Sequence, residues 1–172
     1  MDKAIQVCTE MLSDRGYVLN KKDENVFYFI NKQLNDNLIL FINLLPKLNI
    51  KSVKDYISFL EQEKITHGVI IYNNVITSSA KKIILNLFNK SIERFSIDEL
   101  QFNITSHKYY NLHTKLNDRE KQLFIENIGM KVPILRHNDP VSRYYYFKKG
   151  DIIKVHRKNN YISYRMMAQI SI

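Results

Sequence analysis

The densest set of side chains suited to binding lies between Arg136 and Arg165 of the 172-residue chain. Arginine and lysine can neutralise phosphates and tyrosine can stack on bases, but arginine and tyrosine also anchor protein interfaces. A third interpretation places the tyrosines in a core and the lysines on its wet face, and the residues alone leave all three open. The set comprises Arg143, Lys148, Lys149, Lys154, Arg157, Lys158 and Arg165, interleaved with Tyr144, Tyr145, Tyr146, Tyr161 and Tyr164.

The net charge of +9 predicts an acidic partner, either nucleic acid or a negatively charged protein surface. The excess is uneven. Residues 131–172 hold 9 Lys and Arg against 2 Asp and Glu, whereas residues 1–97 hold 13 against 10. The binding role is therefore expected near the carboxyl end.

Side chains that could break bonds do not form a recognisable catalytic pattern. A nuclease needs an Asp and a nearby Glu-x-Lys on a strand to hold magnesium, and no Glu-x-Lys or Asp-x-Lys lies on a predicted strand. No histidine pair has the spacing of a zinc hydrolase, and the four glycines are too scattered for a phosphate-binding loop. We expect no catalytic residue, no metal site and no cofactor. The histidines are His67, His107, His113, His137 and His156.

Cys8 is the only cysteine, so no internal disulfide can form. It lies between apolar residues of a predicted helix, where a buried small hydrophobe is favoured over a reactive thiol. The sequence has no apolar run of eighteen residues and no export signal. We therefore expect an intracellular protein without a membrane partner.

The first half of the chain alternates helix and strand patterns, which indicates a small α/β domain at residues 1–97. A polar cluster at Ser96–Glu99 marks its expected end. The predicted strands are Val26–Ile30, Leu38–Leu45, Gly68–Tyr72 and Ile92–Phe95. The predicted helices are Lys3–Arg15, a second opened by a capping box at Ser52–Asp55, and a third capped by Thr77 or Ser78 with Ile83, Ile84, Leu87 and Phe88 facing inward.

Residues 98–172 predict an α+β module with a mixed sheet, short helices and a final hairpin, which makes the whole chain α+β. Asp139 is the expected N-cap of a short helix that has Pro140 at its first position and runs through Tyr146. The other expected elements are a strand at Leu100–Thr105, a helix opened at Asn117–Glu120 and ended by Gly129, and strands at Asp151–Arg157 and Tyr161–Ile170.

Three segments of this module carry a specific combined pattern: Asp139–Tyr145, Lys148–Arg157 and Tyr161–Arg165. With Glu99–His107 and His113 upstream, the pattern resembles the C-terminal signature of subunit 5 of eukaryotic RNA polymerases, which is related to the H subunit of the archaeal enzymes. In the first half, the segments Asp14–Tyr17, Ile50–Ile65 and Thr77–Ala80 are similar to the jaw domain of the eukaryotic members. Archaeal members lack that domain, so the resemblance favours a eukaryotic or viral type.

The resemblance implies a non-catalytic subunit of a DNA-directed RNA polymerase. Its C-terminal module would dock on the largest subunit, and its jaw domain would lie near downstream duplex DNA. The implied interface residues are His107, His113, Pro133, Asp139, Pro140, Arg143, Tyr144, Tyr164 and Arg165, and the DNA-proximal ones are Thr77, Ser78, Ser79 and Ala80. It also implies partnership with other polymerase subunits, no obligate homo-oligomer, and a location in the nucleus for a cellular protein or in a cytoplasmic factory or virion for a viral one.

The sequence departs from the family pattern at several positions. Asn111 replaces a proline, Ile134 an arginine, Tyr146 a glycine and Ser78 the proline of a Thr-Pro-Ser-Ala element. Two other functions stay open on the residues alone. One is a free-standing basic DNA-binding transcription protein, and the weaker one is a divergent nuclease.

Overall fold

The computed structural model describes residues 1–168 and divides the chain into two compact units. The N-terminal unit is Met1–Phe102, and the C-terminal unit begins at Asn103. Residues 1–168 contain five α-helices and two mixed sheets, which confirms the predicted α+β class. The short 3-10 helix η1 (Asp98–Leu100) packs against the first helix and buries Leu100. The units therefore divide a few residues beyond the polar cluster.

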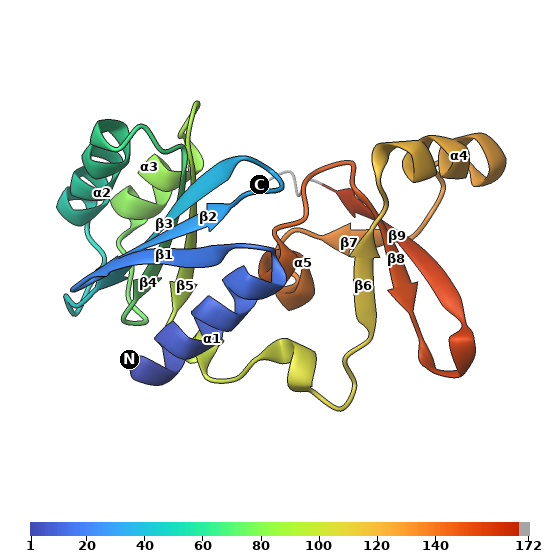
Figure 1. The fold of residues 1–172 in the computed structure, drawn as a ribbon, viewed down its shortest axis with the longest axis horizontal. Coiled ribbons are helices and arrows are strands. Elements are labelled where there is room, and N and C mark those ends of the chain that lie inside the picture. Colours follow the sequence, from blue (N-terminus) through green and yellow to red (C-terminus); the bar gives the residue numbers. More distant parts are fainter. Residues whose placement is uncertain (169–172) are drawn as a thin grey trace. The chain divides into compact units, whose positions relative to one another are not determined.

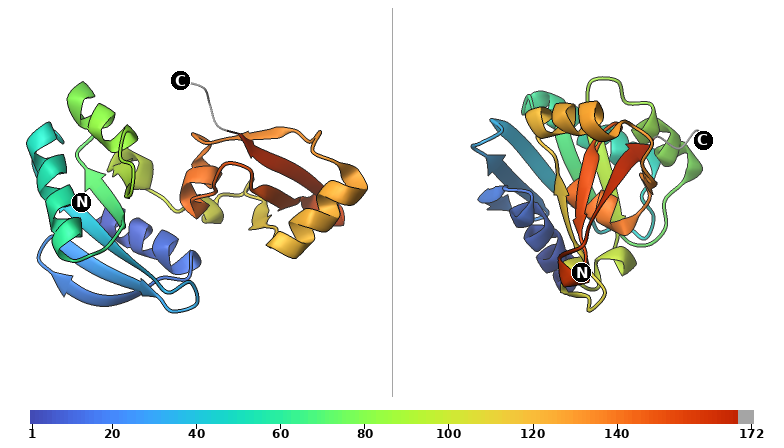
Figure 2. Two further views of the ribbon diagram at one scale, coloured as in Figure 1. Left: turned by 90° about the horizontal axis from the view of Figure 1, so that it is seen from above. Right: turned by 90° about the vertical axis from the view of Figure 1, so that its right-hand side faces the viewer.

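The N-terminal unit is a five-stranded sheet between helices (Figure 1). The first three strands are antiparallel and the last three parallel, in the order β1 to β5. Helix α1 (Asp2–Asp14) lies across one face, and α2 (Ile50–Gln62) and α3 (Ser78–Leu85) cover the other (Figure 2). The strands are β1 (Val18–Asp23), β2 (Val26–Asn31), β3 (Asp36–Asn43), β4 (His67–Tyr72) and β5 (Ser91–Ser96).

The core of this unit follows from two nearly continuous apolar strands. Every residue of β4 is buried, as are the last six of β3, because helices cover both faces of the sheet. Cys8 is fully buried in α1, as predicted, and this burial raises the pKa of its thiol to about 12.

One strand of this unit was missed and two predictions for it were wrong. Strand β1 was not anticipated, because all six of its residues are exposed and no apolar alternation marks it. Helix α2 is capped by Asn49, whose side chain accepts a hydrogen bond from the Ser52 N–H at 2.9 Å, so Ser52 lies inside the helix. Helix α3 ends at Leu85, which leaves Phe88 in the following loop with 97% of its surface exposed.

The C-terminal unit is a four-stranded sheet with one helix on each face. Its order is β6-β8-β9-β7, antiparallel except for the parallel pair β7 and β9. Phe124 of α4 packs with Leu116 and Ile152 on one face, whereas Val141 and Tyr145 of α5 pack with Ile153 on the other. The elements are β6 (Leu112–Lys115), α4 (Asp118–Ile128), β7 (Ile134–Arg136), α5 (Pro140–Tyr145), β8 (Ile152–His156) and β9 (Ile162–Ala168).

The predicted start of α4 at Asn117–Glu120, which forms a capping box, and the final hairpin are confirmed. The strand expected at Leu100–Thr105 is wrong: the Asn103 side chain accepts from the Thr105 N–H at 2.9 Å and folds the chain into the 3-10 turn η2 (Ile104–Ser106). Strands β6 and β7 were missed because they are short and mostly exposed. Residues 169 and 170 of the expected last strand lie outside the described residues.

Candidate functional site

Helix α5 is capped at its start by Asp139 and ends at Tyr146, as the sequence pattern predicted. The Asp139 carboxylate accepts a hydrogen bond from the Val141 N–H at 2.8 Å, and Pro140 occupies the first turn, where an N–H has no intrahelical acceptor. Arg143 lies one turn later, and its N–H donates to the Asp139 carbonyl at 3.0 Å. Tyr146 ends the helix with a φ of 55°, a left-handed conformation that explains why the family pattern has glycine there.

Most of the tyrosines in the Arg136–Arg165 set belong to the core of the C-terminal unit. Tyr144 is buried, and Tyr145 stacks on Phe147 with ring centroids 5.4 Å apart. Tyr164 packs against Phe124 of α4 at 4.5 Å. Tyr161 differs, because 64% of its surface is exposed at the tip of the hairpin. The core interpretation therefore holds for Tyr144, Tyr145 and Tyr164.

The predicted interface residues divide between the two faces of the sheet. Arg165 pairs with Ile153 and His113 with Val155, which places both on the face that α5 covers. Tyr164 and Pro133 border the α4 side instead.

Two of the predicted histidines have different surroundings. His113 is half-buried, and its Nδ1 lies 2.6 Å from the Asn111 carbonyl. Burial lowers the pKa of His113, although that hydrogen bond and Asp139 oppose the change. His107 lies in the exposed loop after η2, where its Nδ1 accepts from the Tyr109 N–H at 3.3 Å. His113 lies close enough to Asp139 and Arg165 for their charges to act on it.

An open groove runs beside β9 on the side away from β8. Strand β7 pairs only with Met166–Ala168, so β9 before Met166 borders this groove. Apolar and aromatic side chains supply most of the lining, and the charged side chains are arginines. The lining residues are Phe124, Ile128, Val132, Pro133, Arg157, Tyr161, Ile162, Ser163, Tyr164 and Arg165. Sequence reasoning missed Phe124, Ile128, Val132 and Ile162, because an apolar residue does not show which groove it lines until its neighbours in space are known.

In the N-terminal unit, the predicted DNA-proximal residues form the start of α3. The Thr77 hydroxyl accepts a hydrogen bond from the Ala80 N–H at 3.2 Å and caps the helix. Ala80 is fully buried, whereas Ser78 and Ser79 are exposed. Thr77 and Ala80 therefore fix the backbone, and the two serines are exposed to solvent.

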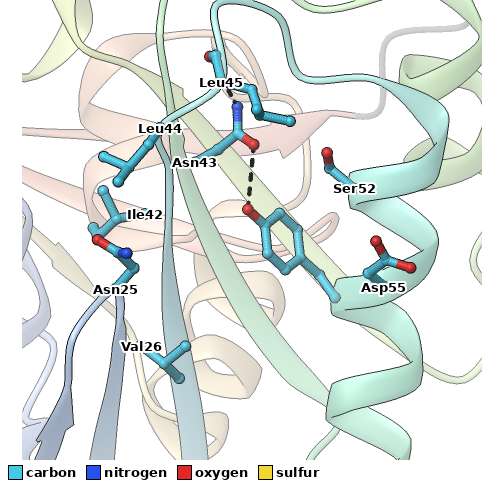
Figure 3. A pocket seen from close by; sticks show the side chains of 9 residues that line it. Asn25, Val26, Ile42, Asn43, Leu44, Leu45, Ser52 and Asp55 are labelled. Carbon is cyan, nitrogen blue, oxygen red and sulfur yellow. Dashed lines mark hydrogen bonds between the residues drawn. The ribbon is translucent and has the colours of Figure 1, made fainter.

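The loop between β3 and α2 supports the start of α3. The Leu48 N–H donates to the Val75 carbonyl at 2.9 Å, and the Thr77 N–H donates to the Leu48 carbonyl at 3.1 Å. Figure 3 shows the hollow below that loop, where the Asn43 amide donates to the Leu45 carbonyl and accepts from the Tyr56 hydroxyl. The loop after β3 thus holds Thr77 in place.

A buried charged network joins α1 to the sheet and was not anticipated. The two terminal guanidinium nitrogens of Arg15, Nη1 and Nη2, donate to the Glu93 carboxylate at 2.6 and 2.9 Å. His67 Nε2 lies 3.0 Å from the same carboxylate, and the Tyr17 hydroxyl donates to Asp36. Arg15 and Glu93 are 78 positions apart, so no sequence spacing could reveal the pair.

Burial alone would raise the pKa of Glu93. The Arg15 guanidinium and the His67 hydrogen bond outweigh it and lower the pKa from 4.5 to about 2.

Within residues 1–168, no helix is both long and apolar enough to cross a membrane.

Comparisons with known proteins match nearly the whole chain. The family model described as RNA polymerase Rpb5, C-terminal domain, matches residues 102–167. A putative DNA-directed RNA polymerase subunit (454R) of Invertebrate iridescent virus 6 is 30% identical over 96% of this chain and 98% of its own length. The subunit rpabc1 of DNA-directed RNA polymerases I, II and III from Dictyostelium discoideum is 27% identical over 91% of each chain. The DNA-directed RNA polymerase subunit 5-like protein 1 of Arabidopsis thaliana is 27% identical over 95% of this chain and 93% of its own length.

The class that these matches define is that of the DNA-directed RNA polymerase subunits. The chain belongs to the RNA polymerase subunit 5 family, as its C-terminal pattern predicted.

Proposed function

We propose that this chain is a non-catalytic subunit of a multisubunit DNA-directed RNA polymerase. The observation that carries the proposal is the Asp139–Arg165 pattern, which lies within the matched residues 102–167 and forms the α5 cap and the β8–β9 hairpin. Its location follows the polymerase: the nucleus for a cellular enzyme, and a cytoplasmic factory or virion for a viral one.

The C-terminal unit docks on the largest polymerase subunit in this proposal. Supporting it are the arginines and tyrosines of the unit, the types that dominate binding energy at protein interfaces. Arg143 and Arg165 are half-buried, which limits their motion before a partner arrives. The phosphodiester chemistry would belong to the larger subunits.

The start of α3 lies near downstream duplex DNA in this proposal. Ser78 and Ser79 offer hydroxyl groups, and serine at 78 supplies a backbone N–H that the family's proline lacks. Such groups donate hydrogen bonds to phosphates and position a duplex without reading its sequence. Lys47 in the supporting loop and Lys51 just after it are exposed, which adds positive charge at the same edge.

The docking proposal is tested by recovering the tagged full-length chain from the cells that express it, with high-salt washes and mass spectrometry. We expect the two largest polymerase subunits to be retained, and Arg143→Ala to reduce their recovery. Lys149→Ala is the matched control, since Lys149 is an exposed cation just beyond the same helix. Recovery of duplex DNA alone, and only at low salt, would instead indicate a free-standing DNA-binding protein.

The DNA proposal is tested by photo-crosslinking within the assembled polymerase. A crosslinker at Ser79 should attach to the downstream duplex, whereas one at Ser58, exposed on the middle of α2, should not. Equal labelling from both positions would remove the special role of the α3 start.

A further inference from the structure

Strand β9 has an edge that the rest of the sheet leaves open. It pairs with β8 along its first five residues, but β7 reaches only Met166, Met167 and Ala168 on the other side. Within the described residues, no strand therefore lies beside Ile162–Arg165 on the groove side. An open edge of this kind is a template for another strand.

The hydrogen-bond parity shows which backbone groups face the groove. The Arg157 N–H donates to the Tyr161 carbonyl, and the Met167 N–H donates to the Asp151 carbonyl, so the odd-numbered residues of β9 bond to β8. The Met166 N–H points the other way and donates to the Pro133 carbonyl at 3.0 Å. By the same alternation, the N–H and carbonyl groups of Ile162 and Tyr164 point into the groove.

This edge lacks the protection that the exposed edge strand β1 has. Strand β1 carries Lys21 and Lys22 and a register shift against β2, both of which discourage pairing with another chain. The β9 segment pairs with β8 without a register shift and contains neither lysine nor proline. Ile162 and Ile128 of α4 nevertheless remain 40% and 61% exposed beside it. Such exposure is typical of a surface that a partner covers.

The two sides of the groove call for different side chains. On the α4 side lie Phe124, Ile128 and Val132. Arg165 and Arg157 lie on the opposite side, on the face of the sheet that α5 covers. The Arg157 Nε donates to the Ser163 hydroxyl at 3.1 Å. No ion pair within residues 1–168 neutralises either arginine. An added strand presents alternate side chains to the two sides.

We propose that the open edge of β9 receives an extended segment of another polymerase subunit in which apolar and acidic residues alternate. Its backbone would pair with Ile162 and Tyr164, its apolar side chains would pack towards α4, and its carboxylates would meet Arg157 and Arg165. This inference rests on the proposed function, because it supposes that the chain assembles with other subunits.

Two other occupants fit the groove less well. The phosphodiester backbone of a nucleic acid has no N–H groups to donate to the free carbonyls of β9. It would also leave Ile128 and Ile162 uncovered. A second copy of this chain would bring another basic C-terminal unit, with 9 Lys and Arg against 2 Asp and Glu in residues 131–172, towards the same arginines.

The test compares Ile162→Pro with Ile162→Val in the full chain. Proline removes one N–H that faces the groove and blocks strand addition, whereas valine keeps it. The fold tolerates proline here, because Ile162 is the first residue of β9 and Tyr161 has the extended φ of −72° and ψ of 130° that precede proline readily. We expect Ile162→Pro to lower recovery of the polymerase by roughly tenfold and Ile162→Val, which loses only one methylene group, to lower it far less.

Circular dichroism will show whether Ile162→Pro folds. If it does not, a second measurement on the wild-type chain tests the strand-addition site without a variant. Hydrogen–deuterium exchange of the wild-type chain should slow at Ile162 and Tyr164 by roughly tenfold or more when the chain is in the polymerase rather than alone.

The outcomes separate this inference from the proposed function. If wild type and Ile162→Pro retain the polymerase equally and the two amides stay unprotected, the strand-addition site is wrong and the subunit role stands. If the wild-type chain retains no polymerase, both fall. If the isolated chain dimerises and Ile162→Pro abolishes the dimer, the occupant is a second copy and the inference is overturned.

Discussion

Single residues of the N-terminal unit carry the most consequential buried charges. Arg15 and Glu93 form a two-pronged ion pair with side chains only 5% and 9% exposed. Breaking such a pair leaves one charge buried without compensation, which costs far more than losing a surface pair. The network fastens the end of α1 to β5 across the sheet.

We predict that Glu93→Gln lowers the free energy of unfolding of the N-terminal unit by roughly 3 kcal/mol or more, because it leaves the Arg15 guanidinium uncompensated. Urea unfolding followed by circular dichroism measures this. Glu61→Gln is the matched control: Glu61 pairs with Lys90 at 2.8 Å but is 58% exposed, so its loss should cost less than about 1 kcal/mol. Similar losses in the two variants would contradict the buried pair.

The same carboxylate predicts a pH dependence. Its folded-state pKa of about 2 lies below the ordinary 4.5, so its stabilising contribution is complete above pH 4.5 and is lost as the pH falls towards 2. The wild-type chain should therefore lose stability across this acid range more steeply than Glu93→Gln. Parallel pH profiles for the two proteins would show that Glu93 does not titrate in this way.

Asp139 should act mainly as a helix cap. Removing its carboxylate in Asp139→Ala should lower the free energy of unfolding of the C-terminal unit by about 1 kcal/mol, while Asp139→Asn, which can still accept from the Val141 N–H, should stay close to wild type. Equal losses of unfolding free energy in the two variants would show that the charge of Asp139, and not its hydrogen bond to the Val141 N–H, stabilises the helix.

At the scale of elements, the corrected start of α2 makes a direct prediction. Asn49→Ala should lower the free energy of unfolding of the N-terminal unit by about 1 kcal/mol, because it removes the acceptor of the Ser52 N–H. Ser52→Ala should cost less, since it keeps that N–H and loses only a 3.2 Å hydroxyl contact with Asn49. The reverse order, measured by urea unfolding, would restore Ser52 as the cap.

Which elements could be predicted depended on how strongly local chemistry marks them. Strands β3 and β4 each contain a nearly continuous apolar run, and α4 is bounded by a complete capping box and Gly129, so their patterns were sufficient. Strand β1 has no such pattern, and it forms because β2 offers a partner along its edge. Local residues cannot reveal a pairing partner, and β6 and β7 were missed for the same reason.

The candidate site shows the same limit. The Asp139 cap and the buried tyrosines follow from spacing and residue type. The placement of Tyr145 and Tyr164 on opposite faces of the sheet depends on strand order, which spacing does not contain.

At the scale of the whole molecule, the two units suit different neighbours. The N-terminal unit carries a modest excess of positive charge and presents Ser78 and Ser79 at a helix start, whereas the positive charge of the chain concentrates in the C-terminal unit. Tyr161 and the groove beside β9 add exposed aromatic and apolar surface to that unit. Such a combination favours assembly with a protein partner over electrostatic binding to DNA alone.

The most direct test is the sedimentation of the untagged chain in a native extract at high salt, with RNA synthesis assayed across the same gradient. We predict that the chain sediments with the RNA-synthesising fractions, far ahead of a 20.5 kDa monomer. Sedimentation near 20.5 kDa, with a shift to faster fractions only when duplex DNA is added at low salt, would contradict it.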